Sequence, residues 1–447
     1  MWKTQTLTGW GRTTASAVPA ARPERIADIQ AALSAAATDD APVLAHGNGR
    51  SYGDQVIAPS GRAVLMRRLN RILSFDDETG TLVAEPGITF DDLLDIFLPR
   101  GWLFPVSPGT SFATLGGALA NDVHGKNHDV VGSFGDHVEW IELVLADGSV
   151  RRVSPQEDAA LFQATIGGMG LTGIVTALAF RLMRVPSNAV VRQRQRINGL
   201  DGFLKAFADV HRRGATYSVG WIDGMARGKN LGRGILEIAE PAEEDIPAEP
   251  RKARKVPFDL PSLALNPLSI RAFNAIYRRQ APEAGSVDTL PYRRFLYPLD
   301  AIEHWNRIYG KRGFYQFQAV LPGKDGAVAL EKLLTEIAKS RRASFLSVLK
   351  TLGGTGRGHL SFPMRGYTLA LDFPRSKGAA ALIGRLERLT LDYGGRVYLA
   401  KDALLSPEGF RTMYPEWQRF RAVLERVDPQ QRFTSAMAHR LKIREAE

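Results

Sequence analysis

The sequence has 447 residues, 44% of them hydrophobic and 23% charged, a composition typical of a globular protein with about three average domains. It contains no cysteine, which excludes disulfides, thiolate catalysis, cysteine-based zinc sites and iron–sulfur clusters. The net charge of +11 favours anionic ligands such as nucleic acid, acidic lipid or phosphorylated substrates, and it is equally consistent with a generally basic surface.

Signals for targeting and for nucleic-acid binding are missing from the sequence. Residues 1–12 contain no apolar core of a secretory signal, and no apolar run reaches the length of about 18 residues that spans a bilayer. We therefore expect a cytoplasmic or peripherally membrane-associated protein, with the periplasmic face left open. No nucleic-acid-binding motif accompanies the positive charge, so no nucleic-acid partner is predicted.

Short strand-like runs alternate with helical runs between residues 20 and 185. The glycine cluster at 47–53 follows directly on the first of these strands. The predicted elements, in chain order, are a buried strand at 41–45, a helix at 91–98 capped by Thr89 or Asp91, a β-hairpin at 141–153 turning on Asp147-Gly148, and a short helix at 161–165.

The composition changes near Pro186, and a second set of elements follows. A stretch rich in proline and charge at about 240–292 predicts a mobile loop. The remaining predicted elements are strands at 217–223, 313–320, 344–349, 367–373 and 396–400, and helices at 327–340 and 378–393. This order indicates an α+β domain built on an antiparallel sheet.

Three glycine clusters lie within 130 residues, at 47–53, 109–117 and 167–173. Glycine lets consecutive backbone N–H groups approach an anion, because no Cβ stands in the way. One cluster alone is better explained as a tight turn, but three clusters beside strands and helices favour a dinucleotide cradle. Gly168–Gly173 fits G-x-G-x-x-G, yet it follows a helical run and no acidic residue lies about 20 positions later, so the cradle is not of the Rossmann type.

The clusters, in this order, resemble the FAD-binding domain of the vanillyl-alcohol oxidase and p-cresol methylhydroxylase superfamily. The matching features are a strand leading into Gly47–Asp54, Glu85-Pro86-Gly87 before a helix, Pro108-Gly109-Thr110 leading to Gly116-Gly117, the hairpin turn Ala146-Asp147-Gly148, and Gly167–Gly173.

Within this superfamily the chain is similar to the decaprenylphosphoryl-β-D-ribose 2′-oxidase family, the flavoprotein half of a two-enzyme epimerase. The similarity covers nearly the whole chain, and its most specific string is His-Gly-Lys-Asn-His. The strings are Gly9-Trp10-Gly11-Arg12, Gly49–Asp54, His124–His128, Gly132–Gly135, Tyr315–Gln318, Leu360–Pro363 and Ala400-Lys401-Asp402.

The resemblance implies an α+β fold in which a two-part FAD-binding domain of the vanillyl-alcohol oxidase type receives an inserted substrate domain built on an antiparallel sheet. Residues 1–188 and 396–447 would form the FAD-binding domain, and residues 189–395 the substrate domain. FAD would bind non-covalently, because covalent relatives link it through a histidine in the first glycine loop, where this chain has Tyr52, or through a cysteine.

The cofactor-binding residues that the resemblance implies lie in the glycine clusters and just after them. They are Gly47, Asn48, Gly49, Arg50, Ser51, Tyr52, Gly53, Asp54, Gly109, Thr114, Leu115, Gly116, Gly117, Asn121, Asp122, Val123, His124, Gly170, Val175 and Tyr398.

Three residues are the expected catalytic groups: Lys401, His124 and Gln318. Lys401 would act at the substrate hydroxyl, either as a base with a lowered pKa or as a charge that stabilises an alkoxide or reduced flavin. Each has a simpler alternative. Lys401 could form a salt bridge with Asp402, His124 could be a structural histidine, and Gln318 could lie on a solvated strand face. The expected substrate residues are Trp221, Gln316, Gln318, Lys350 and Ala370, of which Ala370 replaces the family's active-site cysteine, and no metal site is predicted.

The resemblance implies oxidation of the 2′-hydroxyl of a polyprenylphosphoryl-β-D-ribose to the 2′-keto intermediate, the first half of epimerisation to the arabinose lipid. A short-chain reductase partner and peripheral membrane contact are expected with it. An aldonolactone or alditol oxidase of the same superfamily is the alternative enzyme. A non-catalytic binding protein for anionic lipid or nucleic acid is the alternative outside enzymes.

Overall fold

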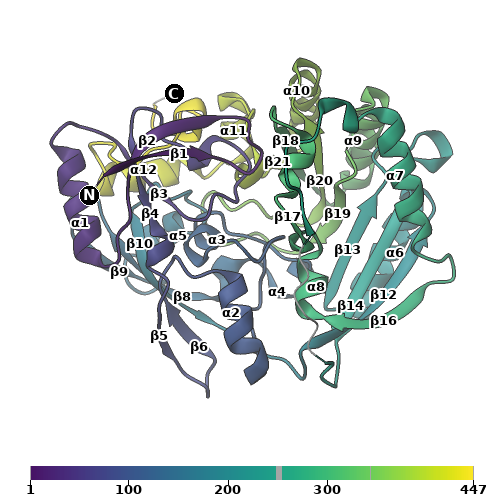
Figure 1. The fold of residues 1–447 in the computed structure, drawn as a ribbon, viewed down its shortest axis with the longest axis horizontal. Coiled ribbons are helices and arrows are strands. Elements are labelled where there is room, and N and C mark those ends of the chain that lie inside the picture. The colour runs from purple at the N-terminus through teal and green to yellow at the C-terminus, as the bar shows by residue number, and fades with distance from the viewer. Residues whose placement is uncertain (1, 248–253, 343, 446–447) are drawn as a thin grey trace.

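The structure is a computed structural model that describes residues 2–247, 254–342 and 344–445. The N-terminal half forms two sheets on one side of the molecule, and a large sheet lies on the other side (Figure 1). The first sheet has the order β1-β2-β4-β3, and the second has the order β5-β6-β10-β8-β9. Their strands are β1 (Lys3–Thr8), β2 (Ala15–Ala21), β3 (Val43–His46), β4 (Arg62–Leu65), β5 (Ile72–Phe75), β6 (Thr81–Ala84), β8 (Val138–Val144), β9 (Val150–Val153) and β10 (Ile174–Arg181).

Five helices and two short strands connect and cover these two sheets in the described chain. Thr89 caps α2, as the sequence predicts, and its side chain and that of Asp92 form a capping box. The elements are α1 (Ile26–Ala37), α2 (Phe90–Phe97), α3 (Leu115–Ala120), α4 (His128–Val131), α5 (Ala159–Thr165), β7 (Trp102–Leu103) and β11 (Met183–Arg184).

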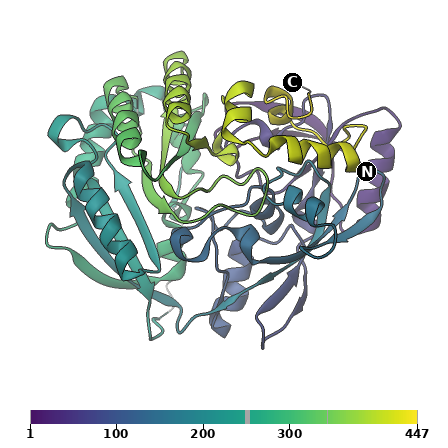
Figure 2. The ribbon, with the colours of Figure 1, turned by 180° about the vertical axis from the view of Figure 1, so that it is seen from behind.

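The large sheet has eight strands in the order β16-β12-β14-β13-β19-β20-β18-β21, all paired antiparallel. Helices α6, α9 and α10 cover one face, and the opposite face points toward the N-terminal sheets (Figure 2). The strands are β12 (Ala189–Ile197), β13 (Tyr217–Ile222), β14 (Gly234–Pro241), β16 (Ser286–Pro291), β18 (Phe314–Pro322), β19 (Ser347–Leu352), β20 (Gly366–Pro374) and β21 (Arg396–Val397), and the helices are α6 (Gly199–Arg213), α9 (Gly326–Ser340) and α10 (Lys377–Asp392).

The C-terminal segment returns to the N-terminal sheets, where it lies beside the first strands in both views (Figures 1 and 2). The amide of Val43 in β3 donates to the carbonyl of Arg432 at 2.6 Å, so the last residues are hydrogen-bonded to the first parallel strand pair. The segment contains a 3₁₀ turn at Leu399–Lys401 and the helices α11 (Pro407–Met413), α12 (Trp417–Val427) and α13 (Ala436–Arg440).

The prediction of a loop at 240–292 is wrong for much of that segment. Asn266 caps a 13-residue helix with Pro267 in its first turn, and this start signal outweighs the polar composition. Within the described chain the strand β16 lies at the sheet edge and pairs with β12 alone, which explains why Val287, Asp288 and Thr289 are exposed. Residues 248–253 of the predicted loop lie outside the described residues. The elements here are α7 (Pro267–Arg279), α8 (Tyr292–Leu296), β15 (Arg254–Lys255), β16 and β17 (Ile302–Glu303).

The strand predicted at 396–400 is shorter than expected. Only Arg396–Val397 pair with β18, and the chain then turns through the 3₁₀ turn at Leu399–Lys401. The domain division at 188 and 395 stays a prediction, although the strands of the large sheet all fall between residues 189 and 397. Among the described helices, none is both long and apolar enough to cross a membrane.

Candidate active site

A cavity of about 650 Å³ lies between the glycine clusters and the uncovered face of the large sheet. This volume falls within the range of about 300–1,000 Å³ that is usual for ligand sites. One wall is formed by residues 45–52 at the end of β3 and after it, by most of residues 107–117 before and within α3, and by residues 169, 170, 173 and 175 before and at the start of β10. The other wall is formed by β13, β19, β20 and β18. The two halves of the chain therefore meet at one site.

The first glycine cluster presents a row of free backbone donors. None of the amides of residues 48–51 donates a hydrogen bond to another residue in the described part of the chain. Gly109 and Gly170 also line the cavity, and a Cβ at either position would meet no atom within 4 Å. Gly170 has φ of +76°, a conformation that favours glycine. Unpaired amides beside glycines form a cradle that fits a diphosphate.

Several buried side-chain atoms around the cavity have no hydrogen-bond partner among the described residues. Buried polar atoms are nearly always hydrogen-bonded in folded proteins, so this group indicates a polar ligand. The atoms are His46 Nε2, Arg50 Nε, Gln55 Oε1, Asn121 Oδ1, Gln316 Oε1 and Gln318 Oε1.

Strand register brings the predicted substrate residues together on the sheet wall. Trp221 on β13 pairs with Val348 on β19, and Val348 pairs with Ala370 on β20. Ala370 in turn pairs with Gln318 on β18. Directly paired residues project from the same face of a sheet, so side chains from four strands line one surface of the cavity.

His124 joins the two walls by hydrogen bonds on both sides of its ring. Its Nδ1 lies 3.1 Å from Lys350 Nζ, and its Nε2 lies 3.1 Å from Gln318 Nε2. The ring packs against Phe362 and Tyr398 at centroid distances of 5.5 and 5.4 Å. Burial and the neighbouring Lys350 hold the pKa of His124 well below its usual value, so the imidazole is neutral.

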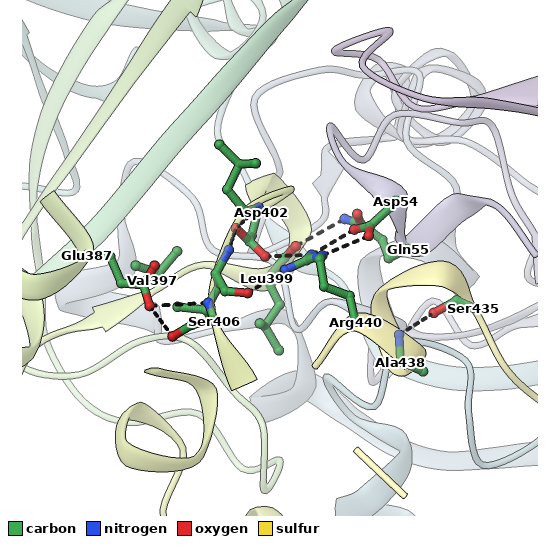
Figure 3. Close-up of polar contacts among 12 residues, drawn as sticks. Asp54, Gln55, Glu387, Val397, Leu399, Asp402, Ser406, Ser435, Ala438 and Arg440 are labelled. Atoms are coloured by element: carbon green, nitrogen blue, oxygen red, sulfur yellow. Dashed lines mark hydrogen bonds and ion pairs between the residues drawn. The ribbon is translucent and has the colours of Figure 1, made fainter. Parts of the chain in front are cut away.

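Lys401 lies where the 3₁₀ turn after β21 faces the cavity, with Nζ 5.6 Å from the centroid of the Tyr52 ring. Burial lowers the pKa of Lys401 to about 8, although the nearby Asp372 opposes this effect. The alternative of a Lys401–Asp402 salt bridge is wrong, because Asp402 is buried and pairs with Arg440 at 2.8 Å (Figure 3).

Arg440 of α13 ties the first glycine cluster to the turn that carries Lys401 (Figure 3). Its guanidinium donates two hydrogen bonds of 2.8 Å to Asp54 and one of 2.8 Å to Asp402. The amide of Tyr52 donates to the carbonyl of Ala400 at 3.0 Å, which joins the same two segments. The position of Lys401 beside Tyr52 thus depends on an arginine seven residues from the C-terminus.

The cavity lining contains the basic residues Arg50, Lys126, Lys350 and Lys401 and the acidic residues Glu237, Asp300 and Glu303. Burial lowers the pKa of Lys350 to about 7, and repulsion by Lys401 and Lys126 adds to this effect. Burial likewise lowers the pKa of Lys126 to about 8. Arg50 lies over the Trp10 ring at 4.4 Å. Partly buried cations that repel one another, as these three lysines do, favour an anionic ligand.

Most of the residues predicted from the sequence line this cavity. They are Gly47, Asn48, Gly49, Arg50, Ser51, Tyr52, Gly109, Thr114, Gly116, Gly117, Asn121, Val123, His124, Gly170, Val175, Trp221, Gln316, Gln318, Lys350, Ala370, Tyr398 and Lys401.

Four predicted cofactor-binding residues do not line the cavity, and each has another role. A Cβ at Gly53 would overlap the carbonyl of Asp402, so glycine allows two segments to meet there. Asp54 pairs with Arg440, and Leu115 is fully buried in the core. Asp122 is fully buried and accepts a hydrogen bond from the amide of Gly135 at 2.9 Å.

Several cavity residues are missed by the sequence reasoning. His46 ends β3 just before the first glycine cluster, and Trp10 lies within the family motif Gly9–Arg12. Both residues are therefore part of, or next to, a motif that the sequence shows. Tyr277 comes from α7, within the segment predicted as a loop. Trp305 and Thr368 carry no local signal, because only tertiary packing brings them to the cavity.

Comparisons with known proteins identify relatives that bind FAD. Residues 19–154 match the FAD binding domain family, and residues 372–441 match the D-arabinono-1,4-lactone oxidase family. A decaprenylphosphoryl-β-D-ribose oxidase of Mycolicibacterium smegmatis is 36% identical over 98% of both chains. The chain belongs to the decaprenylphosphoryl-β-D-ribose oxidase family. It is an FAD-dependent oxidoreductase.

Two further relatives show how far this similarity extends. A Streptomyces coelicolor protein encoded in the mprA 5′ region is 33% identical over 79% of this chain and all of its own length. A D-lactate dehydrogenase of Anaerostipes hadrus is 27% identical over 31% of this chain and 30% of its own. The family resemblance stated from sequence motifs is confirmed, as is the mixed fold with an FAD-binding domain and a large antiparallel sheet.

Proposed function

We propose that the protein oxidises the 2′-hydroxyl of a polyprenylphosphoryl-β-D-ribose to the 2′-ketone. One observation carries the proposal: a single cavity combines a backbone cradle for FAD with three partly buried lysines, in a chain aligned over 98% of its length with a decaprenylphosphoryl-β-D-ribose oxidase. The lysines provide the positive charge that a phosphorylated sugar needs. The glutamines on β18 provide hydrogen-bonding groups for its hydroxyls.

Bound FAD would supply a two-electron hydride acceptor for the alcohol carbon. The unpaired amides of residues 48–51, with Gly109 and Gly170, would hold its diphosphate. Lys401 would accept the hydroxyl proton in its neutral form, which is accessible because burial lowers its pKa to about 8. The carbinol C–H bond and the O–H bond both break, giving ketone, a transferred hydride and a proton.

FAD is proposed to bind without a covalent bond, since the chain has no cysteine and Tyr52 occupies the position of the linking histidine in covalent relatives. Acid precipitation tests this proposal, because non-covalent flavin should remain in the supernatant. Yellow colour that stays with the precipitated chain would contradict it. The cavity also contains His46 and His124, so the test applies to these histidines as well.

Contact with a membrane surface and with a separate reductase are further parts of the proposal. Helix α7 lines the cavity through Tyr277 and exposes Leu268 and Ile276 at 77% and 60% of their surface. Exposed Arg271 and Arg279 lie on the same helix and would favour an anionic bilayer. The 2′-ketone would need a hydride donor to become the arabinose epimer, which a short-chain reductase would supply.

Anaerobic reduction of the bound flavin tests the substrate. Ribosyl polyprenyl phosphate should bleach the flavin absorbance, whereas the dephosphorylated ribosyl lipid should act much more slowly, because it lacks the group that the lysines bind. The match of residues 372–441 to the D-arabinono-1,4-lactone oxidase family favours a second candidate, an aldonolactone or alditol oxidase. Faster bleaching by an aldonolactone than by the ribosyl lipid would support the second candidate and refute the first.

A further inference from the structure

His124 faces a hydrogen-bond donor on each side of its ring. Lys350 Nζ lies 3.1 Å from Nδ1, and Gln318 Nε2 lies 3.1 Å from Nε2. A neutral imidazole has one N–H donor and one acceptor nitrogen, so it can accept from only one of the two. A charged imidazolium has no acceptor nitrogen and would oppose Lys350. One of the two neighbours must therefore accept a hydrogen bond from the ring.

Two tautomers of the ring satisfy these distances, and only a neutral Lys350 allows the first of them. If Lys350 is neutral, its lone pair accepts from His124 Nδ1–H, and the ring accepts at Nε2 from the amide NH₂ of Gln318. If Lys350 is charged, it donates to Nδ1, and the ring donates from Nε2–H to the amide oxygen of Gln318. The second arrangement requires the Gln318 amide to turn by 180°, which exchanges its oxygen and nitrogen.

The other contacts are compatible with both arrangements. Lys350 Nζ donates to the carbonyl of Gly125 at 3.0 Å whether it is charged or neutral. Thr368 Oγ1 lies 2.9 Å from the same amide atom of Gln318 and can accept from its nitrogen or donate to its oxygen. The second amide atom of Gln318 has no partner among the described residues, and Gln318 lines the cavity. The group that Gln318 presents to the cavity therefore differs between the two arrangements: it is the carbonyl oxygen in the first and the NH₂ group in the second.

We propose that Lys350 is a positioning residue that acts through His124 and determines whether Gln318 presents a carbonyl oxygen or an NH₂ group to the cavity. Only neutral Lys350 allows the free atom to be an acceptor, which suits a sugar hydroxyl. Charged Lys350 gives a donor, which suits a ligand carbonyl or an alkoxide. The device lies within the site of the proposed function, but it does not depend on which substrate is oxidised.

The charge of Lys350 can change near neutral pH, because burial lowers its pKa to about 7. Lys401 and Lys126 lower this pKa further, whereas Asp129 raises it. His128 also faces His124, at a ring-centroid distance of 6.2 Å. At a pH below about 7 Lys350 is charged and the ring should carry its proton on Nε2. At higher pH the proton should move to Nδ1. A bound anion should extend the Nε2–H form to higher pH.

His128 provides an internal reference for the measurement. Its Nδ1 accepts from the amide of Gly353 at 3.0 Å, which leaves Nε2–H to donate to Ser133 Oγ at 3.2 Å. The backbone amide of Gly353 can only donate, so it fixes Nδ1 as the acceptor, and the Ser133 hydroxyl can accept from Nε2–H. The tautomer of His128 should therefore stay Nε2–H while that of His124 changes.

The test is ¹⁵N NMR of the purified protein with its bound flavin and labelled histidine, followed from pH 5.5 to 9. Protonated and lone-pair ring nitrogens have well-separated shifts, so the His124 tautomer can be assigned by loss of its signals in His124→Gln. The wild-type ring should exchange Nε2–H for Nδ1–H across neutral pH. A tautomer that is constant over this range would overturn the proposal.

Three variants separate positioning from a merely structural role. Lys350→Arg keeps a permanent charge and should hold the Nε2–H form at every pH. Lys350→Met removes the titrating group and should abolish the pH dependence. Gln318→Glu places a carboxylate acceptor at Nε2 and should fix the Nε2–H form without any change at Lys350. An unchanged pH dependence in Lys350→Met or in Gln318→Glu would overturn the proposal.

Discussion

Arg440 offers the sharpest test of how the fold positions its site. The guanidinium makes three hydrogen bonds of 2.8 Å to the carboxylates of Asp54 and Asp402 and one of 2.7 Å to the carbonyl of Leu405. Asp54 is 8% exposed and Asp402 is 4% exposed. Replacing Arg440 by methionine keeps most of the side-chain volume and leaves two buried carboxylates without their cation.

Removing one partner of a buried ion pair costs about 3–5 kcal/mol, mainly because the remaining charge is desolvated and unpaired. This loss corresponds to a fall in Tm of roughly 6–20 °C for a domain of about 150–250 residues. The flavin should also bind more weakly, since the Arg440 contacts join the segments that carry Tyr52 and Lys401. Flavin release and tryptophan fluorescence on heating measure the two effects separately.

The matched control is Arg419→Met on α12, because Arg419 forms an exposed ion pair with Glu416. Such surface pairs contribute about 0–1 kcal/mol, so this variant should melt within a few degrees of the wild type. Adding Asp54→Asn and Asp402→Asn to Arg440→Met removes the unpaired charges and should recover part of the stability. Equal melting of Arg440→Met and Arg419→Met would refute the reasoning.

Three further predictions concern the cofactor cradle and the base. Gly170→Ala and Gly148→Ala introduce a side chain at φ of +76° and +82° respectively, and of the two glycines Gly170 alone lines the cavity. Equilibrium dialysis should therefore show weaker FAD binding for Gly170→Ala than for Gly148→Ala. Equal FAD binding by both variants would rule out the cradle. Lys401→Met should keep FAD and lower the rate of flavin reduction about 10²–10⁴-fold in stopped flow, the usual contribution of a general base. If Lys401 acts as the base, the wild-type rate should rise with pH through about 8, because the neutral amine is the active form; a rate that falls through the same range would instead show that the charged form is needed.

Much of the fold is predictable from local patterns in the sequence. The helix at 91–98 and the hairpin at 141–153 carry a cap and a turn that act over a few residues, and both are present as α2 and as β8 with β9. The helix α7 is hard to predict because the polar, proline-rich composition around it is typical of a loop, although Asn266-Pro267 is a helix start signal. Ile270 is buried, but Leu268, Phe273 and Ile276 are exposed, so the helix lacks a full buried stripe.

Site residues that belong to short sequence motifs can be predicted from the sequence. Site residues that strand pairing or long-range contacts bring to the cavity cannot. The glycine clusters and His124 stand in recognisable motifs, and they line the cavity. Thr368 reaches it only because Lys350 pairs with it across β19 and β20. The contact of Arg440 with Asp54 spans 386 residues of sequence. No local pattern encodes such long-range pairing.

The choice of lysine at three positions of the cavity has a physical reason that follows from these contacts. An arginine would stay charged at any physiological pH, so arginines at these three partly buried positions would carry a desolvation cost that the nearby Glu237, Asp129 and Asp372 offset only in part. Lysine can release its proton when no anion is near, which is what the lowered pKa values of Lys126, Lys350 and Lys401 indicate. The same side chains become charged when an anion arrives. The cavity can therefore be stable without its ligand and still bind a phosphate strongly, and it retains a neutral amine for proton transfer.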